Sequence, residues 1–142
     1  MQLRTVSRGK LRQLATAGGG PVEARLYACR VAKAPYDKNG KTYLVLDLAA
    51  ALGDLDVLRA VDDHVRRVAG ARFSPLLDGG AQLVVKVPPG GAVKYENDDG
   101  NPAAAWRIED DAYVDAVVRP GAFGDFGYCW LLHRVKPHAA VV

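Results

Sequence analysis

Basic and aromatic residues are interleaved in two parts of the sequence, a combination suited to holding a single strand of nucleic acid. Such a strand is bound by stacking bases on aromatic rings, worth about 1 to 3 kcal/mol per base, while Lys and Arg contact the phosphates. The first part is a predicted hairpin that carries Arg25, Tyr27, Tyr36, Lys38, Lys41 and Tyr43, with Lys33 on the same predicted face. The second part lies within 81–137 and carries Lys86, Tyr128, Trp130, Arg134 and Lys136. These residues form the predicted binding site.

Aromatic residues also have a purely structural use, because Trp and Phe fill the core of a small domain more often than they stack on bases. Both interpretations stay open for Trp106 and Trp130. Phe123 and Phe126, bracketed by glycines in the stretch 121–127, are open to the same structural interpretation. For the tyrosines and lysines of the hairpin, the binding interpretation is favoured.

The sequence contains no recognisable catalytic signature. Its glycine pairs are not followed by Lys-Ser or Lys-Thr at the start of a helix, so no phosphate-binding P-loop is predicted. No Ser or Cys lies in a nucleophile-elbow pattern, and three scattered histidines form neither a triad nor a zinc site. The acidic pair at 98–99 and the acidic triplet at 109–111 are assigned to exposed turns with Asn, Gly and Pro rather than to a cation site. We therefore expect no enzyme, cofactor or metal.

The first half of the sequence predicts a hairpin followed by a helix. Residues 22–33 alternate, with Val22, Ala24, Leu26 and Ala28 on one face and Glu23, Arg25, Tyr27, Cys29, Val31 and Lys33 on the other. Residues 41–49 alternate likewise, with Leu44, Leu46 and Leu48 inside. The pair Asn39-Gly40 between them supplies the dihedral angles of a tight turn. From Asp54 to Val68, apolar residues recur at three- and four-residue spacing, which predicts a helix capped by Asp54.

The second half predicts three or more further strands. Leu83, Val85 and Val87 alternate with the opposite face Gln82, Val84 and Lys86, and Ala112, Val114, Ala116 and Val118 alternate with Tyr113, Asp115, Val117 and Arg119. In the last predicted strand, one face carries Tyr128, Trp130, Leu132, Arg134 and Lys136, and the other carries Cys129, Leu131, His133 and Val135. Short connections between successive strands favour antiparallel neighbours. The predicted fold class is mostly β: a small antiparallel OB-like barrel or sandwich with one α-helix between the strands.

Composition predicts one domain with a basic N-terminal arm. The length of 142 residues fits a single core, and 49% hydrophobic residues are typical of a folded chain. Residues 1–20 carry four basic and no acidic residues before three glycines, and 21–142 form the predicted domain. The arm either contacts phosphates or packs its leucines on the core, and the second explanation is the more common one.

The remaining composition bears on compartment and partners. The net charge of +3 is compatible with a polyanionic partner without requiring one. Cys29 and Cys129 are far apart and match no metal or disulfide framework, which favours a reducing compartment. No apolar run reaches membrane-spanning length and no signal peptide is recognisable, so we expect an intracellular protein without membrane insertion.

The C-terminal pattern resembles a family of small proteins encoded by nucleocytoplasmic large DNA viruses of eukaryotes, the giant viruses. The matching features are the strand Leu83–Pro88, then Gly121 with Phe123, Phe126-Gly127, Trp130 and the pair Arg134-Val135. They cover roughly the last 60 residues. Where such proteins place an aromatic residue directly after the late glycine, this chain has Ala122 first.

The resemblance implies a viral protein with an OB-like fold. Together with the residue pattern, it leads to the hypothesis of non-enzymatic, sequence-tolerant binding of single-stranded DNA in viral DNA replication or repair. The alternative is a minor structural protein, in the capsid or inside the virion, whose aromatic loops contact other viral proteins. The expected location is the host nucleus or a cytoplasmic virus factory, with packaging in the virion and homo-oligomers compatible with either hypothesis.

Overall fold

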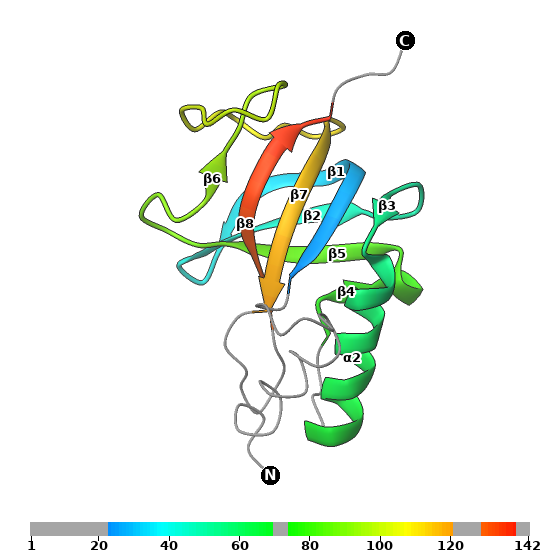
Figure 1. The fold of residues 1–142 in the computed structure, drawn as a ribbon. Helices are drawn as coiled ribbons and strands as arrows, with labels where there is room; N and C mark the ends of the chain where they lie inside the picture. Colours follow the sequence, from blue (N-terminus) through cyan, green and yellow to red (C-terminus); the bar gives the residue numbers. More distant parts are fainter. Residues whose placement is uncertain (1–22, 70–73, 121–128, 139–142) are drawn as a thin grey trace.

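The computed structural model describes residues 23–69, 74–120 and 129–138, and in these residues it is a small β-barrel with one α-helix (Figure 1). The barrel strands are β1 (Ala24–Lys38), β2 (Lys41–Asp47), β5 (Gln82–Val87), β7 (Tyr113–Pro120) and β8 (Trp130–Pro137). Shorter elements are β3 (Leu52–Gly53), β4 (Leu76–Leu77), the 3-10 turn η1 (Asp78–Gly80) and β6 (Lys94–Tyr95). The helix α2 (Leu55–Ala69) lies between β3 and β4.

Five strands close the barrel in the order β5-β2-β1-β7-β8, and β8 returns to β5. Four of the five pairings are antiparallel, but the closing pair is parallel, with Val85 opposite Trp130 and Lys86 opposite Leu131. The predicted OB-like barrel is therefore confirmed, and its sheet is mixed rather than purely antiparallel. A parallel closure joins strands that are distant in sequence, so the short connections on which the prediction relied do not determine it.

The strand β1 is long enough to belong to two sides of the barrel. Its first half pairs with β7 and β3, and its second half, from Arg30 to Lys38, pairs with β2. In Figure 1 the strand rises beside β7, bends at the top and continues behind the front strands. The turn at Asn39-Gly40, with φ of 53° and 77°, returns the chain into β2 as predicted.

A bulge at Ala28 exchanges the two faces of β1. Ala24 and Leu26 point into the core as predicted, but Ala28 has φ of 58° and the register with β7 shifts between Leu26 and Cys29. Cys29 and Val31 are consequently buried. The prediction that these two residues share the outer face with Tyr27 and Lys33 is wrong, because one extra residue in a strand inverts the alternation that follows.

The barrel interior is lined by the apolar alternation that the sequence predicts for the later strands. Fully buried side chains come from each of the five barrel strands and from α2: Leu26, Leu44, Leu83, Val114, Trp130, Leu132, Leu58 and Val61. The outer residues of β5 and β7 are the predicted ones, so these two strands are read correctly from sequence. None of the described helices is long and apolar enough to span a membrane.

The start of the helix is attached to β1. Asp54 donates its backbone N–H to the Arg25 carbonyl (2.9 Å), and its carboxylate accepts the Arg25 backbone N–H (3.0 Å). The helix itself is confirmed within a residue of its predicted bounds. The basic arm 1–20 and the glycine-aromatic loop, including Phe123, Phe126 and Tyr128, lie outside the described residues.

Candidate nucleic-acid interface

One group of predicted residues gathers on the outer face of β1, β2 and β5, which we call the hairpin surface. It consists of Lys33, Tyr36, Lys38, Lys41, Tyr43 and Lys86. The sheet register brings them together, because Tyr36 lies opposite Tyr43, Lys38 opposite Lys41, and Tyr43 opposite Lys86. Residues that face each other across neighbouring strands share one side of the sheet. Leu44 and Leu46 point inward, so Tyr43 points out.

The two tyrosines form the centre of the hairpin surface. Their ring centroids are 6.1 Å apart and their planes are inclined by 38°. Lys33 places its Nζ 4.0 Å from the centroid of the Tyr36 ring, within cation–π range. Both rings are partly exposed. The sequence therefore places two adjacent π-faces on a short, tightly turned hairpin, with four lysines around them.

The lysines of this surface carry unneutralised charge. In the described part of the chain, no carboxylate lies within salt-bridge distance of the four lysine Nζ atoms. Asp37 is nearby on the exposed tip, and its carboxylate accepts a hydrogen bond from the Thr42 hydroxyl (2.7 Å). An anion that approaches the hairpin surface would therefore meet several lysines without displacing an ion pair.

The hairpin surface ends where acidic residues begin, at the far end of β2. Arg30 and Asp47 are register partners joined by hydrogen bonds of 3.0 and 3.3 Å, and Arg30 also contacts Asp111 at 2.7 Å. The backbone N–H of Ala49 and the Arg30 guanidinium lower the pKa of Asp47, while Asp47 and Asp111 raise the pKa of Arg30. Arg30 is thus engaged with carboxylates and does not extend the basic surface.

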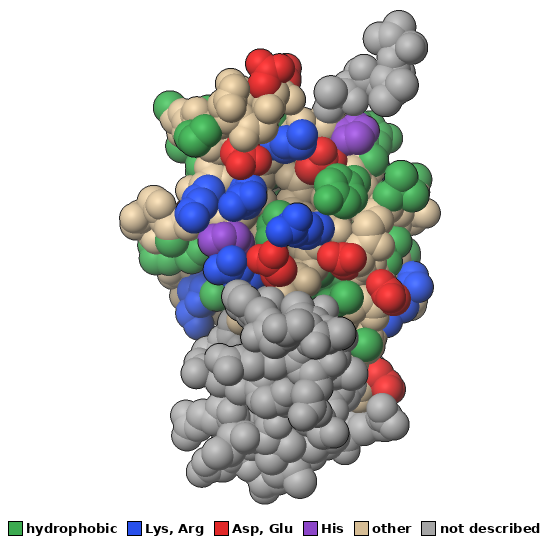
Figure 2. All heavy atoms as spheres, viewed as in Figure 1, with side chains coloured by type: hydrophobic (Ala, Val, Ile, Leu, Met, Phe, Trp, Pro, Cys, Tyr) green, Lys and Arg blue, Asp and Glu red, His purple; other side chains and the backbone are tan. Residues whose placement is uncertain are grey.

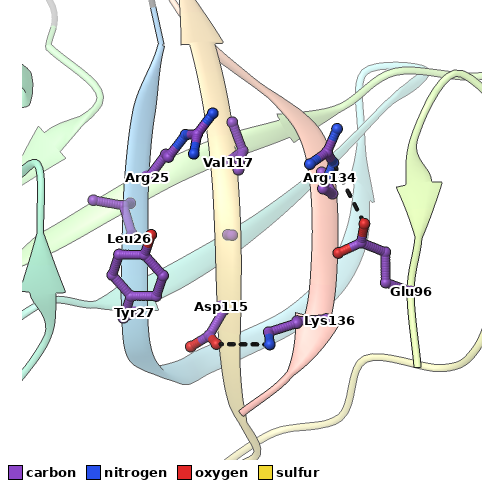
Figure 3. A pocket seen from close by; sticks show the side chains of 9 residues that line it. Arg25, Leu26, Tyr27, Glu96, Asp115, Val117, Arg134 and Lys136 are labelled. Carbon is purple, nitrogen blue, oxygen red and sulfur yellow. Dashed lines mark ion pairs between the residues drawn. The ribbon is translucent and has the colours of Figure 1, made fainter. Parts of the chain in front are cut away.

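A second group of predicted residues lies elsewhere, around a shallow pocket of about 130 Å³ on β1, β7 and β8 (Figure 3). Arg25, Tyr27, Arg134 and Lys136 line it together with Glu96 and Asp115. The prediction that Arg25 and Tyr27 share a face with Tyr43 is wrong, because they belong to the half of β1 that pairs with β7.

The cations of this pocket are paired with acids. Arg134 Nε is 3.6 Å from Glu96, Lys136 Nζ is 3.8 Å from Asp115, and Arg25 contacts Glu23 at 3.3 Å. Asp115 also accepts the Ala28 backbone N–H (3.0 Å) and lies 2.8 Å from His138 Nδ1. These pairs hold the β1 bulge and the end of β8 in place, so the pocket is electrostatically mixed, unlike the hairpin surface.

Trp130 does not belong to any surface. Its side chain is 0% exposed and forms part of the barrel core opposite Val85. The prediction that Trp130 stacks on bases is therefore wrong, and the alternative, a core tryptophan, is correct. Tyr128, its neighbour in the predicted site, lies outside the described residues. Trp106 is partly buried, donates Nε1–H to the Glu96 carbonyl (3.0 Å) and packs edge-on against Tyr95.

The acidic residues at 98–99 and 109–111 lie in turns, where Asp110 and Asp111 make contacts within the fold. Asp98 and Asp99 are exposed in a turn around Asn97, and Asp110 accepts the Ala34 backbone N–H at 2.6 Å. In the ranges that the structure describes, no group of three or more His, Cys, Asp or Glu residues is placed to hold a metal ion.

Three further basic residues were missed in the sequence: Lys94, Arg119 and His133. Lys94 is the register partner of Arg134, His133 precedes Arg134 on β8, and Arg119 is a partly exposed residue of the neighbouring strand β7. Over β6, β7 and β8, Figure 2 shows Lys, Arg and His side chains gathered with a few acidic ones. The sequence does show a concentration of basic residues here, because Arg119, His133, Arg134 and Lys136 all lie in the last two predicted strands.

Comparison with known proteins gives one structural match of note. No family model matches the chain, and no curated protein sequence is significantly similar to it. Among solved structures, the fold is similar to the single-stranded DNA-binding protein from bacteriophage Enc34, with a TM-score of 0.42 and 14% sequence identity. The similarity covers 83% of this chain and 78% of that one.

Proposed function

We propose that the protein binds single-stranded DNA non-enzymatically and without strong sequence preference, through the hairpin surface. The observation that carries this proposal is the pair Tyr36 and Tyr43, partly exposed and surrounded by lysines that have no acidic partner within the described ranges of the chain. Base stacking on aromatic rings tolerates any sequence, and lysines that follow the phosphates do so as well. In OB folds, the outer face of the central strands and the adjoining hairpin loop is where oligonucleotides bind.

The hairpin surface has the composition that such binding needs. Lys38 and Lys41 lie opposite each other at the tip, Lys33 lies over one ring, and Lys86 is beside the other on β5. A strand crossing the two tyrosines would therefore have a cation on each side. Arg25, Arg134 and Lys136 are secondary candidates, because a phosphate there must compete with the carboxylates that already pair with them.

Titration of a fluorescently labelled oligothymidine at two salt concentrations tests this function. Binding should weaken with salt, because phosphate contacts release counterions, with a slope of log K against log salt of about −0.7 per contact for single strands. A parallel titration with oligouridine separates DNA from RNA as the preferred strand. Absence of binding at low salt, or binding that ignores salt, would disprove the proposal.

A protein-contact role is the second candidate, and one observation favours it. Tyr27 and Leu52 are register partners on β1 and β3, and they are 43% and 67% exposed. An exposed aromatic and aliphatic pair of this kind suits a partner protein better than a nucleic acid. If the protein is a minor structural component of a virion, we expect this pair to be covered by a viral protein.

The biological setting that we propose follows the resemblance of the C-terminal strands. A sequence-tolerant single-strand binder would act in viral DNA replication or repair, in the host nucleus or a cytoplasmic virus factory. Homo-oligomers and packaging in the virion are compatible with this role.

A further inference from the structure

A second basic surface lies beyond the hairpin surface, on the outer side of the last strands. It consists of Lys94, Arg119, His133 and Arg134, and we call it the β8 surface. Lys94 of β6 is the register partner of Arg134 in a parallel pair. On β8, a bulge skips His133 in the pairing with β7, so that His133 and Arg134 are both partly exposed between the buried Leu132 and Val135. The bulge thus places two consecutive basic residues outside.

The charges of this surface act on one another. The pKa of His133 lies below its ordinary value, first because the ring is partly buried and then because of the positive charges of Arg119, Lys94 and Arg134, with Glu23 opposing them. Glu23 pairs with Arg119 at 3.2 Å, and Glu96 lies 3.6 Å from Arg134 Nε. Lys94 has no acidic partner among the described residues. Three cations, Lys94, Arg119 and Arg134, thus face two carboxylates, so the balance is positive even when His133 is neutral.

One donor on the β8 surface is left without an acceptor. Arg134 Nε is sealed from solvent and forms no hydrogen bond, because the Glu96 oxygen is too distant. The Arg134 side chain as a whole is 42% exposed, so a phosphate oxygen could accept hydrogen bonds from the exposed part of its guanidinium, beside an exposed lysine and a partly exposed histidine.

The sheet register connects the two surfaces. Tyr43 lies opposite Lys86, Lys86 lies opposite Leu131 across the parallel seam, and Leu131 lies opposite Arg119. All these residues are at least partly exposed, so they form one continuous outer row over β2, β5, β8 and β7. With strands about 4.8 Å apart, the row covers roughly 15 Å from Tyr43 to Arg119. His133 is the next outward residue along β8 after Leu131.

We infer that Lys94, Arg119, His133 and Arg134 are a second phosphate-contact site, which extends the path of a bound single strand from the hairpin surface across the β5–β8 seam. This inference rests on the proposed function. It assigns the hairpin surface to base stacking plus phosphate contact, and the β8 surface to phosphate contact alone, since none of its four residues is Tyr, Trp or Phe. A short oligonucleotide would occupy the hairpin surface only, whereas a longer one would reach both.

Oligonucleotide length separates the two surfaces. The variant K94Q/H133Q and the control R59Q, each of which removes one positive charge near pH 7.5, are titrated with oligothymidines of about 4 and about 12 nucleotides, within the range of site sizes of one OB fold. Arg59 is exposed on α2, away from both surfaces. We expect K94Q/H133Q to bind the longer oligonucleotide several-fold more weakly, with a salt slope smaller by about 0.7, and to bind the shorter one like the control.

Proton uptake gives a second readout. A phosphate at the β8 surface would favour the charged imidazole, so binding of the longer oligonucleotide should strengthen from pH 8 to pH 6 more in the unmodified protein than in H133Q. The single variant K94Q, which changes only an exposed side chain, is expected to bind the longer strand more weakly even if the double variant is unstable.

The outcomes distinguish the two proposals. The second site would be overturned if K94Q/H133Q and R59Q bound the longer oligonucleotide with equal affinity, or if K94Q/H133Q lost the same affinity for both lengths. The hairpin surface would then be the whole interface. Failure of the unmodified protein to bind either length at low salt would overturn the proposed function and the second site together.

Discussion

Tyr36 and Tyr43 are register partners at the end of the β1–β2 hairpin, with ring centroids 6.1 Å apart. Cross-strand aromatic pairs of this kind stabilise a hairpin by about 0.5 to 1.5 kcal/mol beyond the area they bury. The same two rings remain partly exposed, which a core pair would not be. The tyrosine pair therefore stabilises the hairpin and also leaves π-faces available to a ligand. Substitutions can separate the structural role from the binding role.

Replacing either tyrosine by alanine should weaken oligothymidine binding. Loss of one stacked base corresponds to about 1 to 3 kcal/mol. The matched controls are Y36F and Y43F, which keep the ring and should bind nearly as well as the unmodified protein. Thermal unfolding of all four variants measures the structural share of each effect. Equal affinity of the alanine and phenylalanine variants would show that the rings do not stack on bases.

The lysines at the hairpin tip should control the salt dependence. Lys38 and Lys41 are exposed and lie opposite each other, so K38Q/K41Q should lower the salt slope by about 1.4, or 0.7 per lost contact. Affinity should fall for every sequence tested, because phosphate contacts carry no base preference. R59Q/R107Q removes two exposed charges that are not part of the hairpin surface and serves as the control. If both double variants shift the slope equally, net charge rather than the hairpin explains binding.

The sequence predicted which residues lie on the outer face of the barrel better than it predicted how they are grouped. Alternation identified the outer residues of β5 and β7 and the inner residues of β2, and the Asn39-Gly40 turn brought Tyr36, Lys38, Lys41 and Tyr43 together as expected. Arg25 and Tyr27 were placed wrongly because their half of β1 pairs with β7. Cys29 and Val31 were placed wrongly because Ala28 adopts the left-handed conformation at the β1 bulge, and nothing in its residue type indicates this.

The inward-facing residues of β8 and its pairing with β5 were not predicted correctly, for two related reasons. Its bulge at His133 shifts the alternation, so that Val135 and not Arg134 points inward together with Trp130 and Leu132. Its parallel pairing with β5 depends on closure of the whole barrel, which local patterns do not encode. The core position of Trp130 follows from that closure, because it makes Trp130 the partner of the buried Val85.

Gly53 should not tolerate a side chain. Its φ is 107°, and a Cβ built there would lie 2.1 Å from the Arg25 carbonyl oxygen, well inside contact distance. The carbonyl belongs to β1, which cannot retreat without breaking its pairing with β7. We expect G53A to lower the free energy of unfolding by about 2 kcal/mol or more, measured in urea. Gly40 also has positive φ but open space around it, so G40A is a control that tests backbone strain alone and should cost less.

Asp115 should stabilise the β1 bulge through its acceptor oxygen. It accepts the Ala28 backbone N–H at 3.0 Å, and its side chain is only 12% exposed. D115A leaves this N–H without its partner, which costs about 1 to 3 kcal/mol in the free energy of unfolding. D115N keeps an oxygen acceptor and should lose less. Equal destabilisation by the two variants, measured by chemical denaturation, would show that the negative charge toward Lys136 and His138 matters more than the hydrogen bond.

Cys29 should report unfolding through its reactivity. Burial, together with the negative charges of Asp115 and Asp47, raises the pKa of its thiol to about 12. At pH 8.5 the folded protein therefore keeps this thiol protonated, and iodoacetamide should modify Cys29 only when urea exposes it, as peptide mass spectrometry will show. Cys129, which is partly exposed, provides the comparison within the same molecule.

The same pKa shift predicts how stability changes at alkaline pH. The unfolded chain releases the Cys29 proton near the ordinary pKa of 9.0, whereas the folded protein retains it to about pH 12. The folded state thus binds more protons between these values, so this contribution to stability is complete below pH 9 and is lost as the pH rises, by at most about 1.4 kcal/mol per unit. C29A removes the titrating group, and its free energy of unfolding should fall less steeply from pH 9 to pH 10.5. Parallel curves for C29A and the unmodified protein would contradict this origin of alkaline instability.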